Sequence, residues 1–136
     1  MRLLTQHQVN PLNAKLKIEV IDEPNNAGAN CRYDVTGFDT DTNPSSINTQ
    51  GYKTRFSRFN LVFQNGNPND PAIGANGITH EVLLAVLIDR LNGFQSGPFA
   101  HEHNAAALTH LEAAMAELNQ RTAERIERGV EGQRVE

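Results

Sequence analysis

The hydrophobic residues change their spacing once along the chain. In the first half they alternate with polar residues, as in Leu16-Lys-Ile-Glu-Val-Ile-Asp22, which predicts a half-buried strand. Residues 31–38 repeat this pattern and are expected to form a second strand. The polar stretch 39–51 is expected to be a mobile loop, and residues 52–64 are long enough for one or two more strands. In the second half the apolar positions recur every three or four residues, as in helices. The pattern predicts an α+β chain, with a small N-terminal antiparallel β-sheet followed by a C-terminal two-helix hairpin.

Two long helices are expected in the second half. Thr79 is placed to cap a first helix that runs to about Phe94 and is apolar over most of its circumference, so it should be buried on several sides. The second helix is expected to have Pro98 in its first turn and to stop at Gly129. The elements predict a β domain over residues 1–75, a helical hairpin over 76–132 and a frayed tail over 133–136.

Three arginines near the end of the second helix, Arg121, Arg125 and Arg128, fall at i, i+4 and i+7 and leave one side of the helix. On a wheel of about 100° per residue, Arg121 and Arg125 border the main apolar arc without belonging to it, whereas Asn104 falls inside the arc. Planar guanidinium groups in a row suit phosphates, and a buried amide needs a partner. The alternative is an ordinary solvated helix end, salt-bridged by the neighbouring Glu124, Glu127 and Glu131.

The length of this helix limits where a small ligand can bind. Asn104 and Arg121 are 17 residues apart, roughly 25 Å along a helix, and Phe94 lies at the Asn104 end. One subunit cannot close both ends around a small ligand, whereas two antiparallel copies bring the arginines of one chain to the Phe94 end of the other. We therefore expect a symmetric oligomer, a dimer or a higher oligomer of dimers, with ligand pockets between subunits.

Composition restricts the classes of partner. The 136 residues carry a net charge of −4, which argues against binding to DNA or RNA polymers, because phosphate neutralisation needs a basic surface. A local arginine cluster on an acidic protein suits a small anionic ligand better. Hydrophobic residues make up 38% of the chain and Trp is absent, so the core should be thin and oligomerisation would help to bury apolar surface. The single cysteine and the lack of a long apolar run predict a cytoplasmic protein without a membrane span.

Two groups of polar residues imitate metal sites. Asp39, Asp41 and Asn43 have the spacing of a calcium loop, but a proline stands where that loop has its glycine. His101 and His103 are two apart on the expected helix, which would place them on opposite sides, and no cysteine cluster joins them. We expect no metal and no cofactor.

No pair of residues makes a convincing catalytic site. His80-Glu81 is the one tempting acid–base pair, and a polar first helical turn explains it more simply. Cys31 falls in an expected strand, where cysteine is usually a small core residue. Arg55 and Arg58 flank Phe56 and would either extend a basic rim or remain solvated at a strand edge. The protein is therefore expected not to be an enzyme.

Several motifs together resemble a known family. The stretch 77–99, which ends Gly93-Phe-Gln-Ser-Gly-Pro-Phe99, resembles the helical hairpin shared by bacteriophage Thoeris anti-defence sponges and anti-CBASS cyclic-nucleotide sponges. Residues 104–132 continue the likeness. Residues 7–10, 28–38 and 63–66 resemble the β domain that precedes the hairpin in the first Thoeris anti-defence family. The sequence departs from the family pattern at residues 101–103, Ala123 and Cys31.

The resemblance implies a non-enzymatic sponge. Such a protein binds a cyclic ADP-ribose isomer (glyco-cyclic ADP-ribose) that a host TIR-domain enzyme makes, and holds it intact in the host cytoplasm during infection. Carried over by residue, Phe94 and Arg121 would sandwich the adenine, while Asn104 and Arg125 would read phosphate and ribose. Some relatives form hexamers and also bind cyclic di- or trinucleotides at a second site. Further candidates for ligand contact are Arg128, Arg55 and Arg58.

Two other classes of function remain open. A phage structural or assembly protein would use the apolar hairpin only to oligomerise, and Arg125→Ala would then leave every biochemical property unchanged. An enzyme that degrades the messenger would release altered nucleotide when it is denatured.

Overall fold

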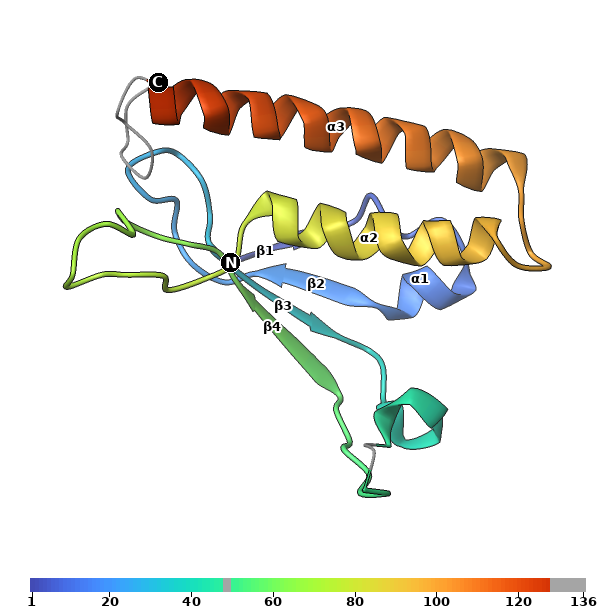
Figure 1. Cartoon of the computed structure of the whole chain (residues 1–136). Coiled ribbons are helices and arrows are strands. Elements are labelled where there is room, and N and C mark those ends of the chain that lie inside the picture. The colour runs from blue at the N-terminus through green and yellow to red at the C-terminus, as the bar shows by residue number, and fades with distance from the viewer. Residues whose placement is uncertain (48–49, 128–136) are drawn as a thin grey trace. The chain divides into compact units, whose positions relative to one another are not determined.

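The computed structural model describes residues 1–47 and 50–127. The chain divides into two compact units, Met1–Asn65 and Gly66–Glu136. The first unit holds the β-sheet and the second holds the two long helices (Figure 1). The α+β class expected from the sequence is therefore confirmed.

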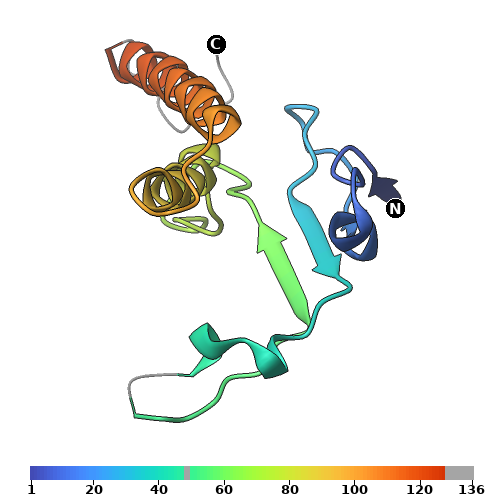
Figure 2. The same ribbon diagram turned by 90° about the vertical axis from the view of Figure 1, so that its right-hand side faces the viewer.

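The sheet is a four-stranded antiparallel meander, in which each strand pairs with the next along the chain. The middle strands β2 and β3 pair through Val20 opposite Tyr33, and β4 runs beside β3 in the opposite direction (Figure 2). Strands β2 to β4 lie within the three segments expected from the sequence but are shorter. The strands are β1 (Arg2–Leu4), β2 (Lys17–Val20), β3 (Arg32–Thr36) and β4 (Arg58–Val62).

Two elements of this unit have no counterpart in the sequence prediction. Strand β1 has only three residues, too few for alternation to be recognised. The short helix α1 (Pro11–Lys15) is capped by Asn10, whose side chain accepts the backbone N–H of Asn13. Gly37, the residue directly after β3, has a φ of +96° and lies against the carbonyl of Lys15, the last residue of α1.

Pairing of the strands separates an apolar face of the sheet from a charged one, because cross-strand partners share a face. Ile18 lies opposite Val35, and Val20, only 1% exposed, lies opposite Tyr33 on the apolar face. The Tyr33 ring meets Phe63 edge to face, with 5.8 Å between centroids. This small cluster, with no Trp to enlarge it, agrees with the thin core expected from composition.

The charged face is organised around Asp34. Its side chain is only 8% exposed and is bound on both sides, by Arg32 (Nε to Oδ1, 3.0 Å) and by Arg58 (Nη1 to Oδ2, 2.9 Å). A buried carboxylate is costly unless it is paired, and here two guanidinium groups supply the pairing. The Arg58 ion pair joins β4 to β3, whereas that of Arg32 lies within β3.

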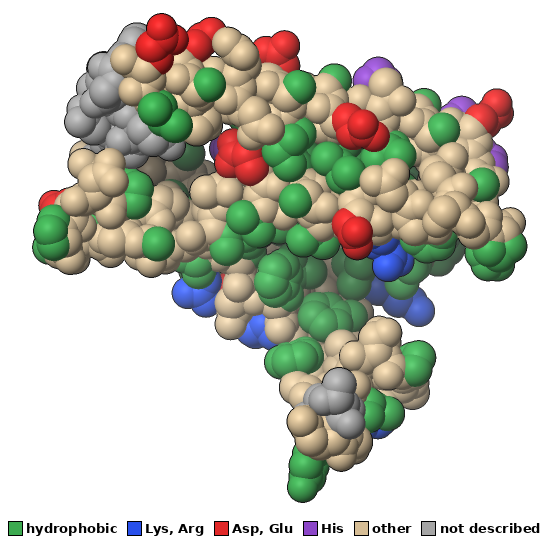
Figure 3. Space-filling view, in the orientation of Figure 1, with side chains coloured by type: hydrophobic (Ala, Val, Ile, Leu, Met, Phe, Trp, Pro, Cys, Tyr) green, Lys and Arg blue, Asp and Glu red, His purple; other side chains and the backbone are tan. Residues whose placement is uncertain are grey.

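The segment 39–57, which we call the arm, joins β3 to β4. Its described residues form two 3₁₀ turns, Thr40–Thr42 and Pro44–Ser46, where the sequence predicted a mobile loop. Arg55 donates to the Asp39 carboxylate through both Nε and Nη2, and Lys53 pairs with Asp41 at 2.9 Å. Since these two carboxylates already have lysine and arginine partners, they do not resemble a calcium loop. Hydrophobic side chains lie on the arm's surface (Figure 3).

The pairing of Asp39 with Arg55 predicts a measurable titration. The Arg55 hydrogen bond, with that of the Asp41 N–H, holds the pKa of Asp39 below its ordinary value. The ion pair should therefore contribute stability above the ordinary pKa of about 4 and lose it only as the pH falls through the lowered pKa. NMR titration of the carboxyl group should show Arg55→Gln raising the pKa of Asp39. Arg58→Gln, which removes a partner of a different carboxylate, should not raise it.

The second unit contains α2 (His80–Gln95) and α3 (Glu102–Glu127). Thr79 caps α2 as predicted, because its hydroxyl accepts the N–H of Val82 at 3.3 Å. The predicted start of the second helix is wrong by about one turn. Pro98 lies in the connecting turn, and α3 begins only at Glu102. The predicted stop at Gly129 lies outside the described residues.

One stripe of α3 is protected from solvent over its whole length, while the other faces are exposed. Its members recur at intervals of four and three residues, the spacing of a seam between two packed helices. Helix α2 contacts α3 but has no buried residue, and Val86 remains 60% exposed. The expectation that α2 is buried on several sides is therefore wrong for the chain by itself. The seam consists of Asn104, Leu108, Leu111, Met115, Leu118, Thr122 and Arg125.

Candidate functional site

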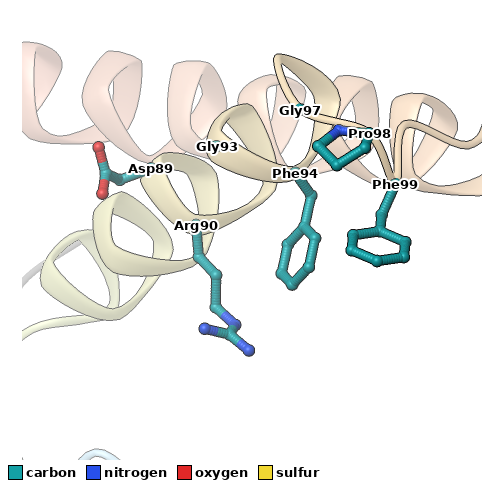
Figure 4. A pocket seen from close by; sticks show the side chains of 7 residues that line it. All are labelled: Asp89, Arg90, Gly93, Phe94, Gly97, Pro98 and Phe99. Atoms are coloured by element: carbon teal, nitrogen blue, oxygen red, sulfur yellow. The ribbon is translucent and has the colours of Figure 1, made fainter. Parts of the chain in front are cut away.

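A cavity of about 360 Å³ lies at the turn between the two long helices. Figure 4 shows that the side chains of Arg90, Phe94 and Phe99 project to the same side of the turn, whereas Asp89 points away from them. The last turns of α2 supply Arg90 and Phe94, and the connecting segment supplies Phe99. The cavity is lined by Asp89, Arg90, Gly93, Phe94, Gly97, Pro98 and Phe99.

Helical spacing explains the contact between Arg90 and Phe94. Residues four apart lie on the same side of a helix, one turn from each other. The guanidinium carbon of Arg90 lies 5.1 Å from the centroid of the Phe94 ring, which is a cation–π arrangement. Phe94 is 37% exposed and Phe99 is 74% exposed, so both rings remain accessible within the unit.

Asn104 lies in the first turns of α3, at the same end of the hairpin as Phe94. It is half-buried and begins the protected seam of α3, as expected for an amide inside the apolar arc. Arg121 and Arg125 lie in the last two turns of the same unbroken helix. The helix therefore separates the two ends of the predicted site, and one hairpin does not bring Arg121 to Phe94.

Arg125 differs from the sequence prediction. It was expected beside Arg121, outside the apolar arc, but it is 5% exposed and ends the seam that Asn104 begins. Arg121, four residues earlier, is exposed. The two arginines thus have different surroundings, and a structural contribution is expected from Arg125 alone. Arg128 lies outside the described residues.

Arg55 and Arg58, the other arginine candidates, are held by carboxylates of the first unit. Arg55 binds Asp39 through Nε (2.9 Å) and Nη2 (2.7 Å), and these hydrogen bonds raise the pKa of Arg55 above its ordinary value. Arg58 binds the buried Asp34. Both therefore have carboxylate partners within the first unit, while their side chains stay exposed to solvent, 63% for Arg55 and 54% for Arg58.

His101 and His103 lie on the same side, not on opposite sides as expected. His101 precedes α3 and caps it, because its Nδ1 accepts the N–H of His103 at 3.0 Å. The two imidazole rings stack with centroids 5.2 Å apart. The N–H of His101 is in turn bound by Gln95 at 2.9 Å, which ties the turn to α2. Within the described ranges, no three His, Cys, Asp or Glu side chains come together as metal ligands would.

Arg90 and Phe99 are the cavity residues that sequence reasoning missed. The spacing of Arg90 and Phe94 by four residues within a predicted helix was a usable signal for the first. Phe99 had no such signal, because the helix was expected to start at Pro98 and the ring would then have belonged to a helical face.

A small antiparallel sheet followed by a helical hairpin, with aromatic and cationic side chains at its turn, defines this chain as a two-unit α+β hairpin protein. Residues 59–123 match the family model of the Acb2/Tad1 hairpin domain. This match covers slightly less than half of the chain, and it confirms the resemblance to the Thoeris anti-defence sponges. The chain is similar to Thoeris anti-defense 1 of Bacillus phage SBSphiJ7, with 54% identity over 59 residues.

This similarity spans less than half of either protein, 43% of this chain and 42% of the relative. The family match begins in β4 and ends near the end of α3, so it contains Phe94, Asn104 and Arg121. Arg125, Arg55 and Arg58 lie outside it. Within the described ranges, neither long helix combines the length and hydrophobicity that crossing a membrane needs.

Proposed function

We propose that the protein is a non-enzymatic sponge that captures cyclic ADP-ribose-type messengers and so inhibits the Thoeris defence of a bacterial host. The observation that carries this proposal is the hairpin-domain match, because it contains three of the four residues proposed to contact the ligand. The name of the phage relative supports the same role. The place of action would be the host cytoplasm, where TIR-domain enzymes release the messenger.

The proposed pocket is formed by two chains. The exposed ring of Phe94 would stack on the adenine, and Arg121 of a second, antiparallel chain would cover the other face. Asn104 and Arg125, at opposite ends of the seam, would contact ribose and phosphate. Helix α2 leaves Val82, Val86 and Leu87 between 45% and 60% exposed, which supports association with another apolar surface.

A sponge that binds the messenger without cleaving it should release the messenger chemically intact. The purified protein would be incubated with the product of an activated TIR enzyme, freed of unbound nucleotide and heated to release what remains bound. Intact cyclic ADP-ribose isomer in the released fraction is the expected result. A linear or cleaved product would identify an enzyme instead, and recovery of no nucleotide would contradict the sponge.

Two further measurements complete this test. Light scattering at micromolar concentration should give the mass of a dimer or hexamer, and a monomer would contradict a pocket shared between chains. The same incubation with cyclic di- and trinucleotides would test the second ligand class. If these ligands use a separate site, they should bind without displacing the cyclic ADP-ribose isomer.

A further inference from the structure

The cavity at the hairpin turn is lined by two further side chains of the kinds that bind nucleotides, besides the Phe94 ring of the proposed function. Three large side chains point to the same side of the turn (Figure 4), and so far only Phe94 has a role. The volume of about 360 Å³ is at the lower end for small-molecule pockets and suits one part of a nucleotide. Arg90 and Phe99 supply the other two of these side chains.

Arg90 is a cation whose contacts leave its hydrogen-bonding capacity available. Among the ion pairs and hydrogen bonds of the described residues, none involves Arg90, and its neighbour Asp89 points away from it (Figure 4). Its contact within the site is with Phe94, whose ring centroid lies 5.1 Å from the guanidinium carbon. A cation–π contact of this kind is not a hydrogen bond, so the planar fork of N–H donors stays available, and it matches the oxygens of a phosphate.

Phe99 is a large apolar ring that the hairpin does not bury. It is 74% exposed and follows Gly97-Pro98 in the connecting turn, beside the Phe94 ring (Figure 4). An exposed aromatic side chain next to another aromatic ring and an arginine is the combination that binds nucleobases by stacking. Since Arg90 covers one face of Phe94, the second ring enlarges the surface left for a base.

We propose that Arg90 and Phe99 contact the captured nucleotide in the same site as Phe94. Phe99 extends the stacking surface for the base, and Arg90 donates hydrogen bonds to a phosphate oxygen. The inference rests on the proposed function and deepens it, because it places a phosphate contact at the Phe94 end of the pocket. This contact is additional to those of the arginines on α3.

The test is equilibrium binding of purified glyco-cyclic ADP-ribose to the full chain at several salt concentrations. Arg90→Ala and Phe99→Ala should each weaken binding about tenfold or more. Arg90→Ala should also make binding less dependent on salt, because one charge contact to the ligand is lost. Arg2→Ala and Tyr52→Ala serve as matched controls in the first unit and should bind as the unaltered protein does. Circular dichroism would verify that each variant keeps its helices.

The outcomes separate this inference from the proposed function. Unchanged affinity in Arg90→Ala and Phe99→Ala, with binding by the unaltered protein, overturns only the added contacts. Weaker binding by Arg90→Ala with unchanged salt dependence also overturns the phosphate contact, since Arg90 would then only hold Phe94 in place. Absence of binding by the unaltered protein overturns the proposed function itself. Arg90→Lys adds a check, because a lysine keeps the charge but loses the planar fork.

Discussion

Replacing Arg121 by alanine should weaken capture of the cyclic ADP-ribose isomer about 100-fold, equivalent to roughly 2.7 kcal/mol. The loss removes the stacking of a guanidinium group on the adenine, and a cation–π contact shielded from water can be worth about 2 kcal/mol or more. Because Arg121 lies on an exposed side of α3, the helical content and the oligomer should be unaffected. Titration calorimetry would measure the affinity, and circular dichroism with light scattering would measure the fold and the assembly.

Arg125→Ala is the informative comparison, since it removes the same group one helical turn later. Arg125 is 5% exposed and ends the seam, so its loss should lower the melting temperature as well as weaken binding. Because the helical wheel placed both arginines outside the apolar arc, the sequence alone predicts that both variants stay folded. If Arg125→Ala had the same melting temperature as the unaltered protein, the burial of this side chain would contribute nothing to stability. Full capture by Arg121→Ala would remove Arg121 from the proposed pocket.

Gly37→Ala should destabilise the sheet by more than about 3 kcal/mol, enough to unfold a small sheet of this kind. A Cβ atom at this position would lie 1.8 Å from the carbonyl oxygen of Lys15, and the φ of +96° is itself unfavourable for alanine. No side-chain movement relieves the contact, because it is with the backbone. Urea unfolding, followed by circular dichroism, would measure the change in the free energy of unfolding.

Gly28→Ala is the matched control for this substitution. Gly28 has a φ of +87°, close to that of Gly37, but a Cβ atom there meets no atom within 4 Å. Its cost should be about 1 kcal/mol, from the backbone conformation alone. If the two variants unfolded at the same urea concentration, the close approach of Gly37 to α1 would be unimportant.

The spacing of apolar residues was sufficient to predict a strand or helix where the element is long enough for that spacing to repeat. The alternation in β2 and β3 and the capping threonine of α2 could be recognised without any tertiary information. The three-residue β1 was too short for recognition. The second helix was expected to start early because proline favours a first helical turn, but in this chain His101 provides the cap.

The position of Arg125 shows why an ideal helical wheel fails over a long helix. A straight helix drifts by about 20° per heptad relative to a packed seam, so three heptads accumulate about 60°. Asn104 and Arg125 are three heptads apart, which is why the wheel placed Arg125 beside the apolar arc. In the structure, the seam keeps its seven-residue repeat, and Arg125 falls in line with Asn104.

Sequence could propose individual residues of the candidate site from local motifs, but it could not predict contacts between residues that are far apart in the chain. Phe94, Asn104 and Arg121 were proposed from the hairpin sequence, and they stay proposals that fall inside the family match. The pairing of Arg58 with Asp34 joins residues 24 positions apart, and no local pattern announces such a contact. The position of Phe99 could be predicted only by knowing that α3 starts at Glu102, because its ring then belongs to the connecting turn and not to the helix.

The meander topology has a consequence for synthesis of the protein. Every strand of the sheet pairs with its sequence neighbour, and the two long helices are consecutive, so the main contacts within each unit join elements that follow one another along the chain. Such connectivity favours rapid folding. All four strands precede α2, so the sheet can form on the ribosome before the hairpin is translated. The sheet would then be folded by the time the last turn of α3, with Arg125, is released.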